Sequence, residues 1–319
     1  MNSLPHLNGR AALAWAALEG LAQPQKRIPC TWLYDQRGSE LFEQITDLPE
    51  YYPTRTEIDL LRRHAREMAA AVGCAAVVIE IGSGSSRKTP LLLRELQAPR
   101  AYVPIDIAPH CLEASVASLK AQFTDLPMYP LVADFNQPLR LPAELPTPAG
   151  RHLCFFPGST IGNLDPAEAL AFLRRMADTL GPEARMLVGV DTTRDPAALI
   201  PAYDDPSGVT AAFNLNLLAR LNRELESDFD LAAFRHEARY DHHRGRIEMH
   251  LVSRRPQEVH LLGKTFRFAA GESIHTENSH KYPVDQFQTL AQAAGWQPAG
   301  CWTDGEEHFS IHLLGRRRS

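Results

Sequence analysis

The feature of this 319-residue sequence that most constrains its fold is a regular alternation of apolar runs and amphipathic segments. Helical spacing in 56–72 precedes the β-branched run 75–81, and further apolar runs follow at 101–107, 128–135, 152–158 and 185–191. Strands that are buried on both faces of a sheet have continuous apolar sequences, and the helices between them cover those faces. The sequence therefore predicts an α/β fold with a Rossmann-like, doubly wound parallel sheet.

This regular pattern stops after residue 192. Segment 203–230 is helical through its middle, and 236–268 alternates polar and apolar residues around a turn at His243-Arg244-Gly245, as antiparallel strands do. A last helix at 284–296 and two closing strands complete the chain. We expect 56–192 and 282–319 to form the doubly wound domain. Segments 1–55 and 193–281 are expected to form an inserted α+β domain.

Charge and cysteine content exclude several classes of protein. A net charge of −5 gives no bulk attraction to nucleic acid or to anionic membranes, and no apolar run reaches membrane-spanning length. The cysteines are odd in number and never spaced as C-x-x-C: Cys30, Cys74, Cys111, Cys154 and Cys301. The histidines also lack the usual spacing of a metal site. We expect a cytoplasmic protein without disulfides, metal, nucleic-acid partner or membrane contact.

The turn after the first apolar run indicates a nucleotide site. Gly82 and Gly84 follow that run, where a backbone without Cβ atoms can approach a ligand closely. Asp106 ends the second run, where a carboxylate can accept hydrogen bonds from both ribose hydroxyls. Asp134 and Phe135 end the third run and can contact the amine and the face of an adenine. Turn geometry alone would also account for the glycines.

The details of this turn favour one nucleotide class. Arg87 occupies the position of the third glycine of a dinucleotide fingerprint, and no glycine precedes Lys88 as in a phosphate-binding loop. Glu80, directly before the turn, suits a cationic ligand better than a phosphate. These residues favour S-adenosylmethionine, whose sulfonium and amino groups are positive. Lys88 then binds the cofactor carboxylate or lies on a solvated helix face.

Six segments carry a resemblance to a known family: "YDQRGSELFEQITDLPEYYPTRTE", "IGSGSSRKT", "PGSTIGNLDP", "AYDDPSGVTAAFNLNLLARLNRELESDFD", "RIEMHL" and "HTENSHKY". Together they resemble the histidine-specific Nα-methyltransferases of ergothioneine biosynthesis, from about residue 25 to the end. The resemblance implies three methyl transfers from S-adenosylmethionine to L-histidine through its mono- and dimethyl forms. The products are trimethylhistidine (hercynine) and S-adenosylhomocysteine, and the enzyme is expected to be a monomer.

The resemblance also implies roles for individual residues. The cofactor contacts are Tyr34, Gly82, Lys88, Asp106, Asp134 and Phe135. The substrate pocket is formed by Tyr51, Asn163, Tyr203, Glu277 and Ser279, with Phe42, Gly158 and Met249 as walls. In this assignment the 1–55 and 193–281 part recognises the substrate.

These assignments are chemically reasonable. Asn163 and Tyr203 offer neutral donors to the substrate carboxylate, while Glu277 and Ser279 can satisfy the N–H and the lone pair of an imidazole. Apolar amino acids would leave those polar groups unpaired. The same residues also fit ordinary structural roles: a helix cap at Asn163, core packing at Tyr203 and Met249, and a solvated strand end at 277–279.

The expected chemistry is an in-line attack of the α-amino nitrogen on the sulfonium methyl group, which needs alignment and a deprotonated amine. The catalytic candidates are Tyr34, Gly158 and Asn163. Our hypothesis is that water held by the Tyr34 hydroxyl and the Gly158 carbonyl carries the amine proton away.

Three other functions compete with this interpretation. The nearest is a methyltransferase of the same architecture that acts on another free amino acid. The second is a non-catalytic sensor of S-adenosylmethionine or histidine. The third is a methyltransferase for RNA or protein, of which the RNA version conflicts with the acidic composition.

Overall fold

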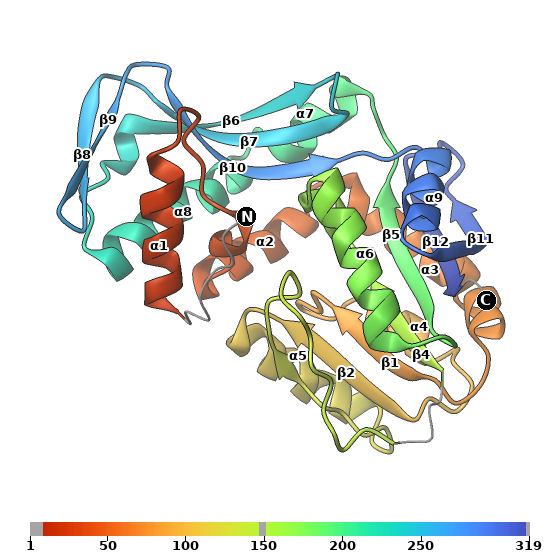
Figure 1. Cartoon of the computed structure of the whole chain (residues 1–319). Coiled ribbons are helices and arrows are strands. Elements are labelled where there is room, and N and C mark those ends of the chain that lie inside the picture. Colours follow the sequence, from red (N-terminus) through yellow and green to blue (C-terminus); the bar gives the residue numbers. More distant parts are fainter. Residues whose placement is uncertain (1–8, 147–150, 317–319) are drawn as a thin grey trace. The chain divides into compact units, whose positions relative to one another are not determined.

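The computed structural model describes residues 9–146 and 151–316, and the chain divides into two compact units (Figure 1). Unit 1 contains the described residues up to Glu50 together with Pro196–Asn278. Unit 2 contains Tyr51–Asp195 and the described residues from Ser279 onward.

Unit 2 is built around a seven-stranded sheet with the strand order β11-β12-β5-β4-β1-β2-β3. Strands β3, β2, β1, β4 and β5 are parallel, while β12 is antiparallel to both β5 and β11. The strands are β1 (Val77–Ile81), β2 (Ala101–Asp106), β3 (Leu131–Val132), β4 (His152–Phe156), β5 (Arg185–Asp191), β11 (Trp296–Thr303) and β12 (Phe309–Arg316). The prediction of a Rossmann-like doubly wound sheet is confirmed.

Helices cover both faces of this sheet, as the doubly wound pattern requires (Figure 1). The helices of unit 2 are α3 (Tyr52–Val72), α4 (Thr89–Leu93), α5 (Pro109–Gln122), η2 (Thr160–Asn163), α6 (Pro166–Leu180) and α9 (Val284–Ala293). Val77 and Ile79 of β1 belong to a core cluster with α6 and α9, whereas Val78 belongs to a cluster with α3, α4 and α5. Alternate residues of one strand thus contribute to two cores.

The third strand is much shorter than its apolar run. Leu131 and Val132 pair with β2 as a strand and Met128 adds one isolated bridge to Tyr102, although 128–135 reads as one continuous strand. Pro130 has no N–H to donate to a ladder. The Asp134 carboxylate accepts a hydrogen bond from the backbone N–H of Asn136 at 2.8 Å, which turns the chain after the strand. Here the hydrogen bond from the backbone to the Asp134 side chain ends the strand, although the sequence has a high β propensity.

Unit 1 combines helices with a small antiparallel sheet. Its helices are α1 (Arg10–Leu21), η1 (Cys30–Leu33), α2 (Gln36–Thr46), α7 (Pro196–Tyr203), α8 (Val209–Leu225) and η3 (Leu231–Ala233). Its strands are β6 (Phe234–Asp241), β7 (Arg246–Ser253), β8 (Gln257–Leu261), β9 (Lys264–Phe268) and β10 (Ser273–His280), whose last two residues belong to unit 2. Three strands pair in the order β10-β7-β6, and β8 and β9 form a hairpin.

The predicted turn between β6 and β7 is present. Its geometry comes from Asp241, whose carboxylate accepts hydrogen bonds from the backbone N–H groups of His243 (2.9 Å) and Arg244 (3.1 Å). Gly245 follows with a positive φ of 59°. An aspartate followed by a left-handed glycine is a typical way to close an antiparallel pair.

Residues 51–55, which were predicted to belong to the inserted part, lie in unit 2. Tyr51 is the N-cap of α3, and Pro53 stands in its first turn. The Tyr52 hydroxyl donates to the Asp191 carboxylate at the end of β5, at 2.7 and 2.9 Å. This buried hydrogen bond attaches the start of α3 to the sheet of unit 2.

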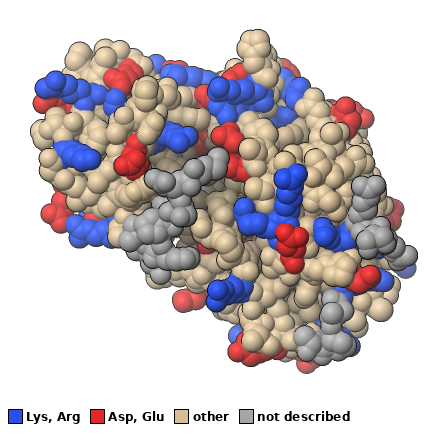
Figure 2. Space-filling view, in the orientation of Figure 1, with Lys and Arg blue, Asp and Glu red and all other residues tan. Residues whose placement is uncertain are grey.

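In residues 9–146 and 151–316, no helix has both the length and the apolar character needed to cross a membrane. On the face drawn in Figure 2, lysines and arginines are interspersed with aspartates and glutamates.

Glu80 has a different role from the one expected of it. Its side chain is 1% exposed and accepts hydrogen bonds from the Tyr102 hydroxyl (2.6 Å) and from the Thr89 hydroxyl (2.7 and 3.0 Å). It therefore joins β1, β2 and the start of α4 inside the core and is not an exposed charge for a ligand. Burial is the largest effect on this carboxyl and raises the pKa of Glu80 to about 7, against the opposing effect of its two hydrogen bonds.

We expect Glu80→Gln to change how stability depends on pH. In the folded state the pKa is about 7, and the reference value is 4.5, so the folded protein binds the Glu80 proton more tightly between these values. Stability from this group is present below pH 4.5 and is lost as the pH rises towards 7. Relative to the variant, the wild type should lose up to about 3 kcal/mol of unfolding free energy between pH 5 and 8. Urea denaturation of both proteins across this range measures the difference, and parallel pH profiles would contradict it.

Candidate functional site

The glycine turn after β1 is tied to the end of β2. The backbone N–H of Gly82 donates to the Ile105 carbonyl and that of Gly84 to the Asp106 carboxylate, both at 2.8 Å. Gly82 and Gly84 have φ values of 66° and 49°, in the left-handed region that favours glycine. The turn therefore needs its glycines for backbone geometry, and it brings the carboxyl ends of two neighbouring strands together.

Asp106 keeps acceptor capacity after making these bonds. One of its oxygens accepts from Gly84, and the other accepts from the backbone N–H of Ala108 at 2.9 Å. A carboxylate offers about four acceptor positions, so each oxygen can accept one further hydrogen bond. Two oxygens held rigidly by backbone donors match the two neighbouring hydroxyls of a ribose. Asp106 thus fits the nucleoside part of S-adenosylmethionine.

An apolar wall accompanies a second carboxylate after β3. Phe135 is half-buried, and its ring packs edge-on against Phe156 and Phe172 with centroid distances of 5.7 and 5.8 Å. The neighbouring Asp134 is half-buried and is oriented by its bond to Asn136. An aromatic ring beside an acceptor suits a purine, whose face is apolar and whose exocyclic amine donates. The contact of these two residues with adenine stays a prediction.

Lys88 and Gly158 share a buried partner that was not predicted from the sequence. The carboxylate of Glu57, in α3, is 0% exposed. Its Oε2 accepts from the Lys88 ammonium at 2.5 Å and from the backbone N–H of Gly158 at 2.8 Å. The loops after β1 and β4 are therefore held by one side chain. Lys88 is a positioned cation within unit 2 and not a solvated helix residue.

A glycine in β5 makes room for this carboxylate. A Cβ atom on Gly189 would lie 2.0 Å from the Glu57 Oε1 atom, far inside contact distance. The Glu57 side chain therefore lies directly against the β5 backbone, which only glycine permits. The apolar pattern of the sequence predicts a role for neither residue. The two sequence features that could have identified them are a glutamate on the core face of α3 and a glycine inside a strand.

The loop that carries Asn163 packs on the end of β10. Asn163 ends η2, and a Cβ atom on its neighbour Gly162 would lie 2.7 Å from the His280 carbonyl oxygen. The N-cap of α6 is Asp165, which forms a capping box with Glu168, so the alternative role of Asn163 as a helix cap is wrong. Unit 2 thus brings the Asn163 loop beside residues 279–280.

Asp191 organises the same end of β10. Its carboxylate is 0% exposed and accepts from the Lys281 ammonium at 2.6 Å, from Tyr52 and from the backbone N–H of Thr193 at 3.1 Å. Lys281, itself 1% exposed, also donates to the Ser279 hydroxyl oxygen at 2.9 Å. Ser279 is therefore held by a buried ion pair. Neither Lys281 nor Asp191 was predicted from the sequence. The feature that could have identified Asp191 is its place as an aspartate at the end of an apolar strand.

Tyr34 and Phe42 form an aromatic group in unit 1. Their ring centroids lie 5.6 Å apart, and the Tyr34 ring lies 5.5 Å from that of Phe213 in α8. Tyr34 directly follows η1, and Asp35 caps α2 by accepting from the backbone N–H of Gly38 at 2.7 Å. The cap fixes where α2 begins and thereby the separation of Tyr34 from Phe42.

Tyr203 lies at the end of α7 and is 7% exposed. Its carbonyl oxygen accepts from the His236 Nε2 atom at 2.7 Å, and the other ring nitrogen of His236 accepts from the Asn214 amide at 2.9 Å. Burial lowers the pKa of His236, the largest effect on that ring. A neutral imidazole with one donor and one acceptor thus holds the Tyr203 backbone.

Met249 and Glu277 come from neighbouring strands of unit 1. Met249 is 1% exposed, pairs in register with Ala238, and its carbonyl oxygen accepts from the Thr276 hydroxyl at 3.0 Å. Glu277 follows Thr276 in β10 and is half-buried. The ligand contacts expected of these residues stay predictions.

The predicted site residues are divided between the two units. Unit 2 holds those expected to contact the nucleoside, together with Gly158, Asn163, Tyr51 and Ser279. Unit 1 holds Tyr34, Phe42, Tyr203, Met249 and Glu277.

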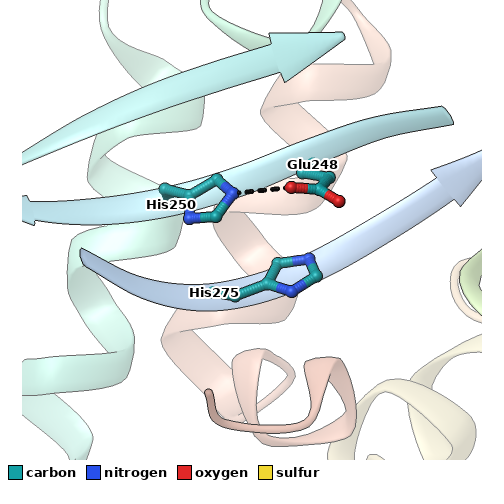
Figure 3. A group of neighbouring side chains, drawn as sticks. All are labelled: Glu248, His250 and His275. Atoms are coloured by element: carbon teal, nitrogen blue, oxygen red, sulfur yellow. Dashed lines mark hydrogen bonds and ion pairs between the residues drawn. The ribbon is translucent and has the colours of Figure 1, made fainter. Parts of the chain in front are cut away.

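One group of side chains in unit 1 offers donor atoms that suit a metal ion (Figure 3). One ligand atom each from Glu248, His250 and His275 lies within 4.8 Å of the others. The two imidazole rings are stacked, with centroids 4.9 Å apart and planes inclined by 15°. Lone pairs on nearly parallel rings do not converge readily on one ion. Two histidines and a carboxylate nevertheless form a donor set that zinc accepts.

Hydrogen bonds already engage these donor atoms. Glu248 accepts from His250 at 3.0 Å and from the Arg246 guanidinium at 2.9 Å, and the His275 Nε2 atom bonds the Glu277 carbonyl at 3.0 Å. The hydrogen bond from His250, with that from Arg246, lowers the pKa of Glu248 to about 2 despite burial. The group thus connects β7 with β10, and an ion would have to replace some of these bonds.

Comparison with known proteins identifies the family of the chain. A family model described as "Histidine-specific methyltransferase, SAM-dependent" matches residues 13–316. The "Histidine N-alpha-methyltransferase" of Mycolicibacterium smegmatis is 42% identical over 93% of this chain and 92% of its own length. The "Histidine N-alpha-methyltransferase" of Mycobacterium tuberculosis is 41% identical over 99% of this chain and 98% of its own length. "Ergothioneine biosynthesis protein 1" of Neurospora crassa is 34% identical over 92% of this chain and 33% of its own length.

We expect Asp106→Asn to weaken binding of S-adenosylmethionine about 10- to 100-fold. The amide removes the charge and half of the acceptor capacity at this position, and a hydrogen bond to a charged group contributes about 1.5–3 kcal/mol. Asp178→Asn is the matched control because Asp178 is exposed on α6. Titration calorimetry with S-adenosylhomocysteine measures both variants. Equal affinity in Asp106→Asn and the control would contradict the role of Asp106.

Proposed function

The chain belongs to the histidine-specific, S-adenosylmethionine-dependent methyltransferase family, and we propose that it methylates the α-amino nitrogen of free L-histidine. The observation that carries the proposal is the arrangement within unit 2. The glycine turn with Asp106 suits the nucleoside, and the same unit places the Asn163 loop beside Ser279 at the end of β10.

We propose three successive transfers, giving trimethylhistidine for ergothioneine biosynthesis. The resemblance to relatives named for histidine Nα-methylation and for ergothioneine biosynthesis supports this. A protein that acts on this free amino acid can work as a cytoplasmic monomer, and we propose that state. The mono- and dimethyl forms are then substrates in their own right.

The protein's part in the reaction is binding and alignment. S-Adenosylmethionine supplies an electrophilic methyl group when it is bound. Asp106, Asp134 and Phe135 are proposed to hold its nucleoside. The Glu57 carboxylate binds Lys88 in the loop after β1 and the backbone of Gly158 in the loop after β4, and so holds these two loops together. Rigid positioning of the reacting groups can account for several kcal/mol of barrier lowering.

Substrate recognition is proposed to use polar groups. Asn163 and Tyr203 donate to the substrate carboxylate, and Glu277 and Ser279 bind the two imidazole nitrogens. Tyr51, Phe42, Gly158 and Met249 complete the pocket. Water held by the Tyr34 hydroxyl and the Gly158 carbonyl is proposed to accept the amine proton, because a protonated amine has no lone pair for attack.

The direct test offers the purified protein S-adenosylmethionine and each of the twenty amino acids in turn. We expect a product only with L-histidine, carrying three added methyl groups by mass spectrometry. The buffer contains EDTA, since we propose that no metal takes part. Methylation of another amino acid in place of histidine would support the alternative substrate. A product that stops at one methyl group would refute the proposal of three transfers. A requirement for added divalent cations would refute the proposal that no metal takes part.

We expect Glu277→Ala to raise the KM for histidine tenfold or more, with a much smaller change for S-adenosylmethionine. The variant removes the acceptor proposed for the imidazole N–H, and a hydrogen bond to a charged group contributes about 1.5–3 kcal/mol. Glu258→Ala is the control because Glu258 is exposed in β8 of the same unit. Steady-state kinetics with each substrate varied separate the two KM values. An unchanged KM for histidine would remove Glu277 from the imidazole site.

A further inference from the structure

We propose that His236 is a positioning residue for substrate binding. By holding the carbonyl group at the end of α7, it keeps the Tyr203 side chain in place to bind the carboxylate of histidine. The inference rests on the proposed function, because it takes Tyr203 as a contact of that carboxylate. Both residues lie in unit 1. The His236 side chain is 1% exposed, so bulk water does not compete for its hydrogen bonds.

Helix α7 cannot fix its C-terminal end with backbone hydrogen bonds alone. The last carbonyl groups of a helix have no donor within the helix, and Pro201 removes one more N–H from this short element. The Asp204 N–H reaches back to the Ile200 carbonyl at 2.9 Å. The Tyr203 carbonyl instead accepts from the His236 Nε2 atom at 2.7 Å. A side chain of β6 therefore holds the end of α7.

The Asn214 amide fixes the tautomer of His236. A carbonyl oxygen only accepts, so the Nε2 atom carries the proton, and a neutral ring then has its lone pair at Nδ1. The Asn214 amide nitrogen lies 2.9 Å from that Nδ1 atom and 3.3 Å from the His250 carbonyl oxygen. Its two hydrogens thus meet two acceptors. A turned amide would place its oxygen against the His250 carbonyl, where two acceptors repel each other.

The chain that follows Tyr203 is also held by α8. The Asp205 carboxylate is 4% exposed and accepts from the first two N–H groups of α8, those of Val209 at 3.0 Å and Thr210 at 2.7 Å. Asn214 lies in the same helix. Segment 203–205 is therefore fixed at one end by the start of α8 and at the other by the ring that α8 holds.

The position of the Tyr203 backbone decides where its phenol lies. The ring moves with its Cα atom, and a hydrogen bond weakens steeply when its distance and angle depart from the ideal values. Tyr203 is 7% exposed, so the packing around it leaves a displaced ring little room to readjust. Loss of the hydrogen bond from His236 should therefore weaken substrate binding, although His236 is not proposed to touch the substrate.

A purely structural role of His236 is the competing interpretation, and two amide substitutions separate the two roles. In His236→Gln the longer side chain can place an N–H near the position of Nε2 and keep the donor to the Tyr203 carbonyl. In His236→Asn the shorter side chain reaches only the position of Nδ1, so it keeps a partner for Asn214 and leaves that carbonyl unsatisfied. Each variant loses one of two buried hydrogen bonds, so a structural role predicts similar effects.

The experiment measures the Kd for histidine by calorimetry in the presence of S-adenosylhomocysteine. We expect His236→Asn to raise this Kd about tenfold, and His236→Gln to stay within about threefold of the wild type. The affinity for S-adenosylhomocysteine should change less than about twofold in both, because its proposed nucleoside contacts lie in unit 2. His243→Asn is the control, because His243 is exposed in the turn between β6 and β7.

A double-mutant cycle tests whether His236 acts through Tyr203. Tyr203→Phe removes the phenol hydroxyl and should itself raise the Kd for histidine. In that background His236→Asn should raise the Kd by less than about twofold, because no positioned hydroxyl remains to be lost. A structural role would give effects that multiply. Unfolding temperatures establish that each variant is folded at the temperature of the measurement.

A measurement on the unmodified protein covers the case in which His236→Asn does not fold. Nitrogen-15 NMR of protein labelled in its histidine rings should show His236 with its proton on Nε2 at pH 7.5. The signal is assigned by its absence from His236→Gln. A neutral ring with its proton on Nδ1 would overturn the inference, because it could not donate to the Tyr203 carbonyl.

Two further results would overturn the inference while leaving the proposed function in place. One is an equal Kd for histidine in His236→Asn and His236→Gln. The other is a full effect of His236→Asn in the Tyr203→Phe background. An unchanged Kd in Tyr203→Phe would instead remove Tyr203 from the proposed substrate contacts, and the inference with it. A wild type that neither binds nor methylates histidine would overturn the proposed function as a whole.

Discussion

The buried ion pair between Asp191 and Lys281 is the interaction on which the rest of the candidate site depends. It joins the carboxyl end of a central strand to the segment that follows β10, and Tyr52 attaches the start of α3 to the same carboxylate. Removing one partner of such a pair leaves an uncompensated charge in the core, at a cost of about 3–5 kcal/mol. The end of β10 is therefore fixed to the sheet of unit 2 by electrostatics, and the neighbouring Tyr282 packs in the core cluster of the same unit.

A second constraint acts at the carboxyl ends of the parallel strands. These ends meet at one edge of the sheet, and each contributes a polar residue that is already oriented by backbone donors or by a buried partner. Asp106 is held by Gly84 and Ala108, and Lys88 is held by Glu57. Groups fixed before a ligand arrives lose little entropy when they bind it. Unit 2 thus orients the residues of the proposed nucleoside site without using residues of unit 1.

Periodicity and turn chemistry decide how much of this structure could be predicted from the sequence. The five parallel strands and the turn at 243–245 leave local patterns, and Asp106 could be found because it ends a strand at a fixed point of the pattern. The short length of β3 and the buried role of Glu80 could not be predicted, because hydrogen bonds of side chains decide both. Glu57 and the Asp191–Lys281 pair were equally hidden, because their partners lie 31 to 139 residues away in the chain.

The end of β10 couples the stability of the core to a residue of the proposed pocket. The Lys281 ammonium binds the Asp191 carboxylate at 2.6 Å and donates to the Ser279 hydroxyl oxygen at 2.9 Å. A substitution at either charge therefore disturbs the core and Ser279 together. Because the residues are in contact, the effects of single substitutions are not additive, and the charge pair must be exchanged as a whole before an effect on Ser279 can be separated from an effect on folding.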